Sequence, residues 1–248
     1  MSAIEKNSEK KSNFNKCVAI IQSSYIPWRG YFDFIDSADV FVIYDDIQYS
    51  TGSWRNRNQV KTKTGLKWLT VPVHKKTGML IDEVSIDRSQ LWQNSHRILL
   101  KESLGSASYF KDAMEIWEEG IAPEHYTISQ LNIKLIYSIC NYLEITTPIV
   151  MSRDYHLTGA KTERLIGLIK KIGGTIYLSG PTASAYLDEN QFRENGISLQ
   201  YKTYDYPSYP QPWGSFVGNV SVLDIIANTG KEARQFLKSQ SNNIIAVS

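Results

Sequence analysis

Two adjacent carboxylates stand at the end of an apolar run early in the chain. Residues 40–44 are apolar throughout, which is typical of a strand covered on both faces, and Asp45 and Asp46 follow directly. A carboxylate that takes a proton from a reacting group acts as a general base, so each aspartate is a candidate catalytic residue. An acidic pair that only ends a strand is the alternative for either residue taken alone.

A second group of reactive side chains follows in the sequence SWRNRN at residues 53–58. Trp54 offers a flat ring, Arg55 and Arg57 offer guanidinium groups, and Asn56 offers an amide. Because arginine binds phosphate or carboxylate with two parallel hydrogen bonds, this stretch is a candidate anion contact. Solvated arginines and an ordinary core tryptophan are the alternative.

The elements around these residues indicate a βαβ unit. Residues 17–21 form a short apolar run rich in β-branched side chains, which predicts a buried strand. Pro27 then favours a turn or the first position of a helix, and apolar residues continue at helical spacing to Ile35. With the second strand at 40–44, strand, helix and strand follow one another closely.

In such units, a ligand usually binds at the carboxyl ends of the strands and the loops beyond them. Gln22, Tyr25 and Trp28 follow the first predicted strand, and Asp45 and Asp46 follow the second. We therefore expect polar and aromatic side chains to converge at one edge of the sheet and to line a pocket there.

His96 is the histidine with the clearest candidate role. It lies on the apolar face of a helical stretch between residues 89 and 143. A neutral imidazole near a carboxylate is a common general base, so His96 is a candidate catalytic residue. A hydrogen-bonded core histidine is the alternative.

The sequence TGAKTERL at residues 158–165 is the nearest approach to a phosphate-binding loop. It has one glycine before Lys161 and Thr162, where two at fixed spacing are required, and this argues against nucleoside triphosphatase chemistry. The helix that begins there still offers free amides to an anion, with charge from Lys161 and Arg164. Ser179 and Gly180 follow a predicted strand, where they either contact a ligand or form a plain turn.

The pattern of elements predicts an α/β fold with a central, mostly parallel sheet flanked by helices. A small β-hairpin extension is expected at residues 58–87, with Pro72 at an edge or a bulge. We expect residues 1–15 to be a flexible tail and residues 16–248 to form a single α/β domain, with a helical insertion around 89–145.

Composition excludes several classes of protein. The formal charge of +2 on 248 residues is too small to favour a nucleic-acid partner, and no apolar run approaches the 18 residues that membrane insertion requires. Cys17 and Cys140 are expected to be buried free thiols in a reducing compartment, which favours the cytoplasm. The four histidines show no metal-ligand spacing, so no metal site is expected.

Several sequence blocks resemble the WbqC-like family, which occurs in bacterial gene sets for O-antigen and related surface glycans. The blocks are QSSYIPWRGYFDFIDSADVFVIYDDIQYSTGSWRNRNQVK, WLTVPV, GAKTERLIGLIKKIGGTIYLSGP, YPSYPQPWGSF and SVLDIIANTG. Ala160 departs from the family pattern, which has an acidic residue there, and this weakens the case for a metal at that loop. The resemblance points to the following residues: Gln22, Tyr25, Pro27, Trp28, Asp45, Asp46, Trp54, Asn56, Arg57, His96, Lys161, Thr162, Arg164, Ser179, Gly180, Tyr209, Pro210 and Gln211.

The resemblance implies a cytoplasmic enzyme of O-antigen, and hence lipopolysaccharide, biosynthesis that acts on a nucleotide-linked amino sugar. The expected reaction is transfer of an acyl or aminoacyl group from a thioester to the sugar amine. It needs a base and donors for the oxyanion, but no protein nucleophile. The candidate base is either aspartate or the histidine, the two arginines are candidate pyrophosphate contacts, and the candidate stacking rings are Trp28, Trp54 and Tyr209.

No tightly bound cofactor is expected, because the donor would be a co-substrate: a coenzyme A thioester or the thioester of an acyl carrier protein. A homodimer is compatible with the sequence. Two other functions stay open. One is a nucleotidyltransferase-like enzyme, although the first turn lacks the paired histidines of that class. The other is a non-catalytic protein that binds a glycan precursor or scaffolds partner enzymes.

Overall fold

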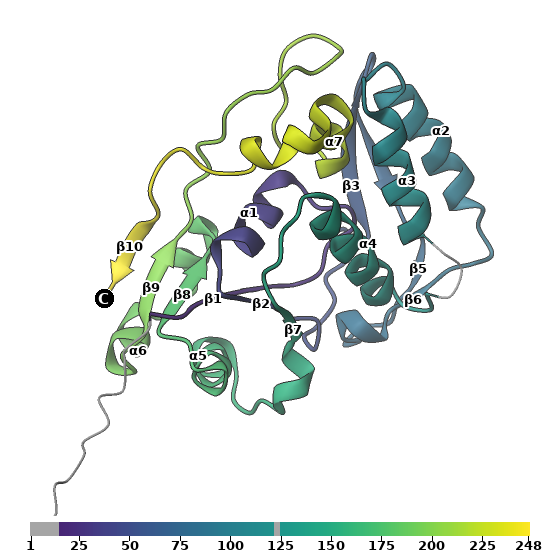
Figure 1. The fold of residues 1–248 in the computed structure, drawn as a ribbon. Coiled ribbons are helices and arrows are strands. Elements are labelled where there is room, and N and C mark those ends of the chain that lie inside the picture. Colours follow the sequence, from purple (N-terminus) through teal and green to yellow (C-terminus); the bar gives the residue numbers. More distant parts are fainter. Residues whose placement is uncertain (1–14, 122–124) are drawn as a thin grey trace, which may run out of the picture.

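A six-stranded sheet in the order β10-β9-β8-β1-β2-β7 is the centre of the fold (Figure 1). The computed structural model describes residues 15–121 and 125–248, so the tail expected at residues 1–15 lies outside the described residues except for Asn15. β10 runs antiparallel to β9, whereas all other neighbours pair in parallel, which confirms the predicted α/β fold. The strands are β1 (Cys17–Ile21), β2 (Val40–Ile43), β7 (Ile149–Met151), β8 (Ile176–Ser179), β9 (Ser198–Tyr201) and β10 (Ile244–Val247).

Helices cover both faces of this sheet. Ala19 of β1 belongs to a core shared with α1 (Arg29–Ser37), α4 (Ile128–Tyr142) and α7 (Val222–Thr229). Its neighbours Val18 and Ile20 belong to a second core, shared with α5 (Lys161–Ile172) and α6 (Glu189–Glu194). Successive residues of a strand point to opposite faces, so a strand buried on both sides is apolar at nearly every position.

The strand order creates a switch point beside β1. From β1 the chain passes through α1 to β2, and β7 then adds to the outer edge of β2. The chain returns through α5 to β8, which pairs with the opposite edge of β1. Connections thus lead away from β1 and β8 in opposite directions, and in open α/β sheets the crevice at such a point is the usual ligand site.

Three helices fill the stretch from 89 to 145 where the sequence predicts helical structure: α2 (Trp92–Leu104), α3 (Phe110–Gly120) and α4. In Figure 1 they lie on the side of the molecule opposite β9 and β10. α4 begins after Thr127, whose hydroxyl and amide exchange hydrogen bonds with Gln130 in a capping box. The assignment of residues 16–248 to a single domain stays a prediction.

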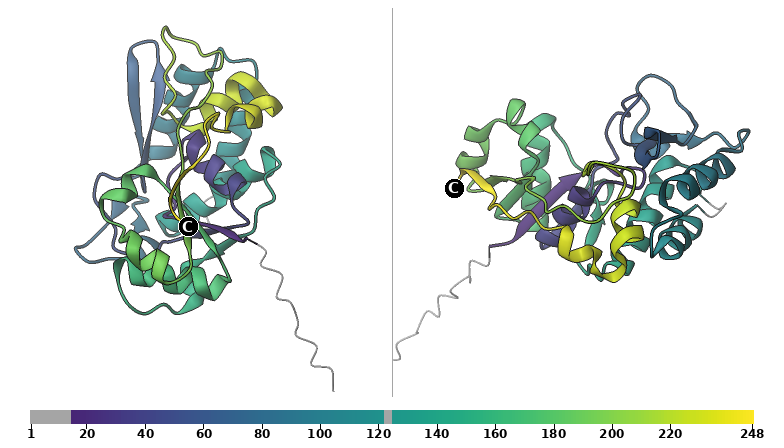
Figure 2. Two further views of the ribbon diagram at one scale, coloured as in Figure 1. Left: turned by 90° about the vertical axis from the view of Figure 1, so that its left-hand side faces the viewer. Right: turned by 90° about the horizontal axis from the view of Figure 1, so that it is seen from above.

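Two small antiparallel hairpins extend the fold between β2 and α2. β3 (Arg57–Thr62) pairs with β4 (Gly65–Thr70) and stands at one edge of the molecule (Figure 2). β5 (Val73–His74) pairs with β6 (Ser85–Ile86), and Pro72 lies between β4 and β5, outside either ladder.

No helix in the described parts of the chain is long and apolar enough to cross a membrane.

The C-terminal part contains two elements that the sequence patterns do not predict. α6 begins after Asp188, whose side chain accepts hydrogen bonds from the amides of Asn190 and Gln191. β10 forms the edge of the sheet beside β9 and contains a bulge. α7 stops at Thr229, and a 3-10 turn (Gly230–Phe236) follows.

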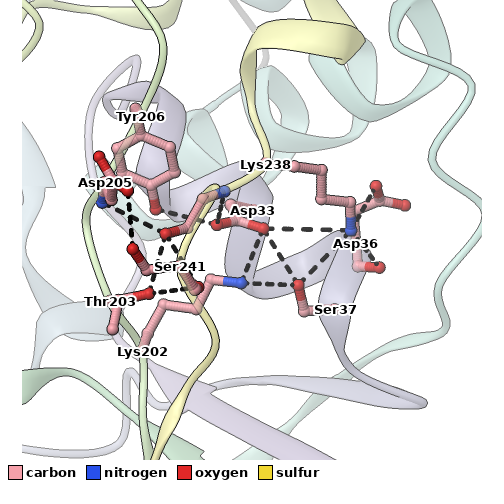
Figure 3. Close-up of polar contacts among 10 residues, drawn as sticks. Asp33, Asp36, Ser37, Lys202, Thr203, Asp205, Tyr206, Lys238 and Ser241 are labelled. Atoms are coloured by element: carbon pink, nitrogen blue, oxygen red, sulfur yellow. Dashed lines mark hydrogen bonds and ion pairs between the residues drawn. The ribbon is translucent and has the colours of Figure 1, made fainter.

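A buried polar cluster joins α1 to the chain after β9 and to the chain after the 3-10 turn (Figure 3). We call it the Asp33 cluster, and its members are Asp33, Ser37, Lys202, Tyr206 and Ser239. The Asp33 carboxylate is fully buried, forms an ion pair with Lys202 at 2.9 Å, and accepts hydrogen bonds from the Tyr206 hydroxyl at 3.0 Å and the Ser239 amide at 3.3 Å. This single carboxylate therefore ties three distant segments together.

Candidate functional site

A cleft of about 1170 Å³ opens over the switch point, at the carboxyl ends of β1, β2 and β8. Its wall combines the loop after β1, the chain after β2 and the start of α5, which are far apart in the sequence. Those residues singled out from the sequence that line the cleft are Gln22, Pro27, Trp28, Asp46, Trp54, Arg55, Lys161, Thr162, Arg164, Ser179 and Gly180.

Asp46 supplies the carboxylate of the cleft. One of its oxygens accepts a hydrogen bond from Arg164 Nη2 at 2.6 Å, and the other accepts one from the hydroxyl of Ser152. The Asp46 and Arg164 side chains are only 13% and 20% exposed, so this ion pair is largely shielded from water. Among the described residues that line the cleft there is no other Asp or Glu, and no His or Cys, so Asp46 is its candidate base.

Asp45 lies behind the cleft wall and has a different environment. It is 5% exposed, and its two oxygens accept hydrogen bonds from the Ser23 amide at 2.8 Å and the Ser129 hydroxyl at 2.5 Å. These bonds hold the loop after β1, which carries Gln22 into the cleft. The geometry therefore favours a positioning role for Asp45 rather than contact with a substrate.

Arg55 brings a second cation to the cleft. Its Nη1 donates to the side-chain oxygen of Gln22 at 2.9 Å, while its Nε is buried without a hydrogen-bond partner. Burial lowers the pKa of Arg55, and the neighbouring Tyr31 and Asp45 oppose that shift, but a guanidinium keeps its charge at neutral pH. A buried N–H without a partner costs about 1–3 kcal/mol, and a ligand that accepted from it would recover this cost.

The N-terminus of α5 forms another wall of the cleft. Gly159 and Lys161 both have positive φ, +78° and +50°, which is uncommon for a lysine. Lys161 is exposed and makes no hydrogen bond or ion pair with any described residue, while the Thr162 hydroxyl accepts from the Asp188 amide at 3.2 Å. A free ammonium beside free helix amides is a favourable environment for phosphate.

Aromatic rings that the sequence analysis did not single out complete the lining. Tyr44, Tyr177, Tyr186 and Tyr204 all face the cleft. Tyr204 packs edge-on against Trp28 with ring centroids 5.1 Å apart, and burial raises its pKa to about 12, so its hydroxyl stays protonated and can donate. No shared local pattern marks these tyrosines: Tyr44 and Tyr204 follow strands, Tyr177 lies within β8, and Tyr186 follows a 3-10 turn (Pro181–Ala185).

Tyr25 and His96 lie away from this cleft, in a hydrogen-bonded core. The Thr70 carbonyl can only accept, so His96 donates to it through Nε2 at 3.1 Å, and His96 Nδ1 then accepts from the Tyr25 hydroxyl at 3.0 Å. The Tyr25 oxygen in turn accepts from Trp117 Nε1 at 2.8 Å. Burial lowers the pKa of His96 to about 4, so the ring is neutral and both nitrogens are occupied.

This burial predicts a pH dependence of stability. A histidine with a pKa near 6.5 in the unfolded chain and about 4 in the folded protein binds its proton more tightly when unfolded, so stability falls as pH drops below about 6.5. Between pH 7.5 and 5, His96 should account for a loss of about 2 kcal/mol. Urea unfolding of His96→Gln at both pH values should show a loss smaller by that amount, and equal losses in both proteins would contradict the assignment.

Four further residues predicted for the site lie outside the cleft lining: Asn56, Arg57, Tyr209 and Gln211. Asn56 is buried between the Tyr49 hydroxyl and the Val71 carbonyl, with both hydrogen bonds at 2.8 Å. Arg57 lies over the Trp68 ring at 4.2 Å. They bring no group into the cleft, so their predicted contact with a substrate gains no support from this geometry.

The other two of these four residues, Tyr209 and Gln211, belong to the loop at residues 206–216, which packs against α7 and lies outside the cleft lining. Tyr209 and the side-chain amide of Gln211 both donate to Asp224 at 2.8 Å, and Lys61 donates to the Gln211 oxygen at 2.9 Å. These contacts pack the loop against the rest of the fold.

Both cysteines are free thiols, and Cys140 is buried as expected whereas Cys17 is only partly buried. Burial raises the pKa of Cys17 to about 11 and that of Cys140 to about 12, and neither lines the cleft. Since the thiolate is the nucleophile, we expect a Cys17→Ala/Cys140→Ala variant to keep its turnover within about twofold once packing losses are corrected. A folded but inactive double variant in a steady-state assay would instead indicate covalent catalysis.

No three His, Cys, Asp or Glu side chains of residues 15–121 and 125–248 cluster as metal ligands would.

The WbqC-like protein family matches residues 22–236, which include every residue that lines the cleft except Ile20 and Ile21. The "Uncharacterized protein Rv1507c" of Mycobacterium tuberculosis (strain ATCC 25618 / H37Rv) is 44% identical over 228 residues, covering 90% of this chain and 98% of that protein. No solved structure matches the chain. The chain belongs to the WbqC-like protein family.

Proposed function

We propose that this protein transfers an acyl or aminoacyl group from a thioester to the amine of a nucleotide-linked sugar during assembly of O-antigen or a related surface glycan. The observation that carries the proposal is the composition of the cleft, where one carboxylate, three cationic side chains and several aromatic rings surround one space. The resemblance to a family found in gene sets for surface glycans supports the pathway.

The size and charge of the cleft suit a nucleotide sugar together with a donor. Small-molecule pockets commonly enclose about 300–1,000 Å³, and this cleft is larger. Lys161, the α5 amides and Arg55 favour a pyrophosphate, and the rings of Trp54 and Tyr186 are available to stack on a base or a sugar.

The chemistry needs one proton acceptor. In the proposed reaction the sugar amine attacks the thioester carbonyl carbon, a C–N bond forms and the C–S bond breaks. Asp46 accepts the proton that the nitrogen loses and passes it to the departing sulfur, so the products are an amide and a thiol. Arg164 balances the Asp46 charge and can donate to the oxyanion that develops on the carbonyl oxygen.

Turnover assays test this proposal directly. The purified protein would be incubated with a panel of nucleotide-linked amino sugars and with coenzyme A or carrier-protein thioesters, and the products would be weighed by mass spectrometry. An amide product that requires both substrates is the expected result. Binding of the nucleotide sugar without any product from the panel would favour the non-catalytic binding protein, and pyrophosphate release from a nucleoside triphosphate would favour a nucleotidyltransferase.

Binding of the nucleotide sugar should depend on Lys161 and Arg55. We expect Lys161→Ala or Arg55→Ala to weaken binding about tenfold each, because each removes one charge-assisted contact worth about 1.5 kcal/mol. Arg57→Ala is the matched control, since that guanidinium lies over Trp68, and its dissociation constant should stay within about twofold. If calorimetry showed that Arg57→Ala weakens binding of the nucleotide sugar more than Lys161→Ala and Arg55→Ala do, this assignment of the anion site would be wrong.

A further inference from the structure

One stretch of the chain carries an excess of positive charge beside the cleft. Residues 47–81 contain seven of the 27 Lys and Arg residues and none of the 25 Asp and Glu residues, whereas the whole chain has a formal charge of only +2. The remainder of the chain is therefore acidic, at −5. Four of these seven residues lie in the β3–β4 hairpin, one lies in the loop before it and two lie in the turn after β5.

Four lysines of this stretch are exposed and free of ion pairs. Lys63, Lys67, Lys75 and Lys76 form no ion pair with any residue in the described parts of the chain. Other exposed lysines, such as Lys111 and Lys238, do pair with a carboxylate. The charge here is thus available to a partner, and only an acidic partner would complement it.

Two exposed tryptophans connect this charge to the cleft. Trp54 and Trp68 are 46% and 43% exposed, with ring centroids 5.4 Å apart, and the Arg57 guanidinium lies over Trp68. Trp54 lines the cleft, whereas Trp68 borders a hollow of about 430 Å³ between β4 and α2, next to Leu91, which is 83% exposed. We call Lys75, Lys76, Arg57, the two tryptophans and Leu91 the basic surface. Lys75 donates to the Thr51 hydroxyl at 3.0 Å, whereas Lys67 lies on the opposite face of β4 from Trp68.

We propose that the basic surface docks an acidic carrier protein that brings the acyl or aminoacyl thioester to the cleft. This inference rests on the proposed function, since it identifies the donor for the same reaction. Exposed aromatic residues and arginine are typical of the centre of a protein interface, and lysines around them steer an acidic partner. Because Trp54 belongs to both the surface and the cleft lining, a thioester arm from a docked carrier enters the cleft directly.

The positions of the apolar side chains favour a protein over a membrane. The hairpin tip, residues 62–65, has the sequence TKTG and offers no apolar side chain to the headgroup region, and the exposed Trp54, Trp68 and Leu91 line the cleft and the hollow instead. A long nucleic acid would have to continue over a chain whose remainder is acidic. A folded acidic protein of limited size meets neither obstacle.

The test compares charge reversal inside and outside the basic surface. A purified bacterial acyl carrier protein with its phosphopantetheine arm is the probe, titrated against the full-length protein by calorimetry. The variant is Lys75→Glu/Lys76→Glu, and the matched control is Lys111→Glu/Lys134→Glu, which reverses two lysines of α3 and α4. We expect the first variant to weaken carrier binding at least tenfold and the control to change it less than twofold. Trp68→Ala should also weaken binding, and it should do so equally at low and high salt.

Turnover with two donors separates this inference from the proposed function. With a carrier thioester, Lys75→Glu/Lys76→Glu should lose at least tenfold in kcat/KM, and with a coenzyme A thioester it should lose none. Turnover from coenzyme A without any carrier binding would overturn the docking inference and leave the function standing. Carrier binding that depends on these lysines, without turnover from either donor, would overturn the proposed function and leave the docking inference standing. Tighter binding to anionic phospholipid vesicles or to a single-stranded oligonucleotide than to the carrier would also overturn the docking inference.

Discussion

Asp46→Asn should lower kcat by a factor of about 10²–10⁴ while the protein stays folded. Asparagine keeps the shape of the side chain and a hydrogen-bond acceptor for Ser152, but it cannot take a proton from the sugar amine. No second carboxylate or imidazole lines the described wall of the cleft to replace it. The measurement is a steady-state assay with the substrates identified above, accompanied by circular dichroism and thermal unfolding.

Asp82→Asn is the control for this experiment. Asp82 also forms an ion pair with an arginine, Arg153, but it lies outside the cleft lining. Both variants therefore lose one carboxylate–guanidinium pair, and only the variant at Asp46 loses the base. If Asp46→Asn retained full activity, or if Asp82→Asn lost as much, Asp46 would have no part in the mechanism.

Lys202→Met should destabilise the protein by about 3–5 kcal/mol, because it removes the closer and buried counter-ion of the Asp33 carboxylate. Asp33 is fully buried and Lys202 is 7% exposed, so water cannot replace the lost ammonium. For a chain of this size the melting temperature should fall by roughly 10 °C. Thermal and urea unfolding would measure the change.

Two further variants identify the cause of that loss. Asp33→Asn/Lys202→Met removes both charges and should recover most of the stability, as buried pairs replaced together usually do. Lys238→Met is the matched control, because Lys238 approaches the same carboxylate at 4.0 Å but is 47% exposed, and it should cost less than about 1 kcal/mol. A double variant no more stable than Lys202→Met would show that packing, not charge, explains the loss.

The sequence is informative about this protein where its patterns are local. The apolar runs at β1 and β2 depend on residues close together, and the structure has these strands where they were predicted. The capping box at Thr127 is equally local. Asp188 and Gln191 carry a similar capping signal before α6, so that helix was within reach of the same reasoning. β10 could not be predicted from local patterns, because more than forty residues of loop and helix separate it from its partner β9.

The candidate site depends on contacts that local patterns do not contain. Gln22, Tyr25 and Trp28 follow the same strand, yet Gln22 and Trp28 line the cleft whereas Tyr25 turns into the core. Ile26 has a positive φ of +36°, an outlier for a β-branched residue, and its carbonyl accepts from the Asn58 side chain at 2.8 Å. The direction of each side chain in this loop is thus set by the distant β3, and no period in the loop itself reveals it.

The position of β1 in the middle of the sheet has a consequence for synthesis of the chain. β1 is made first, but β8, the strand that occupies one of its edges, ends more than 150 residues later at Ser179. At about 5–20 residues per second, a nascent chain spends roughly 8–30 s with that edge open to other strands. The ribosome-bound protein is therefore most exposed to mispairing and aggregation before its second half emerges, and slow release with a need for chaperones should accompany its production in cells.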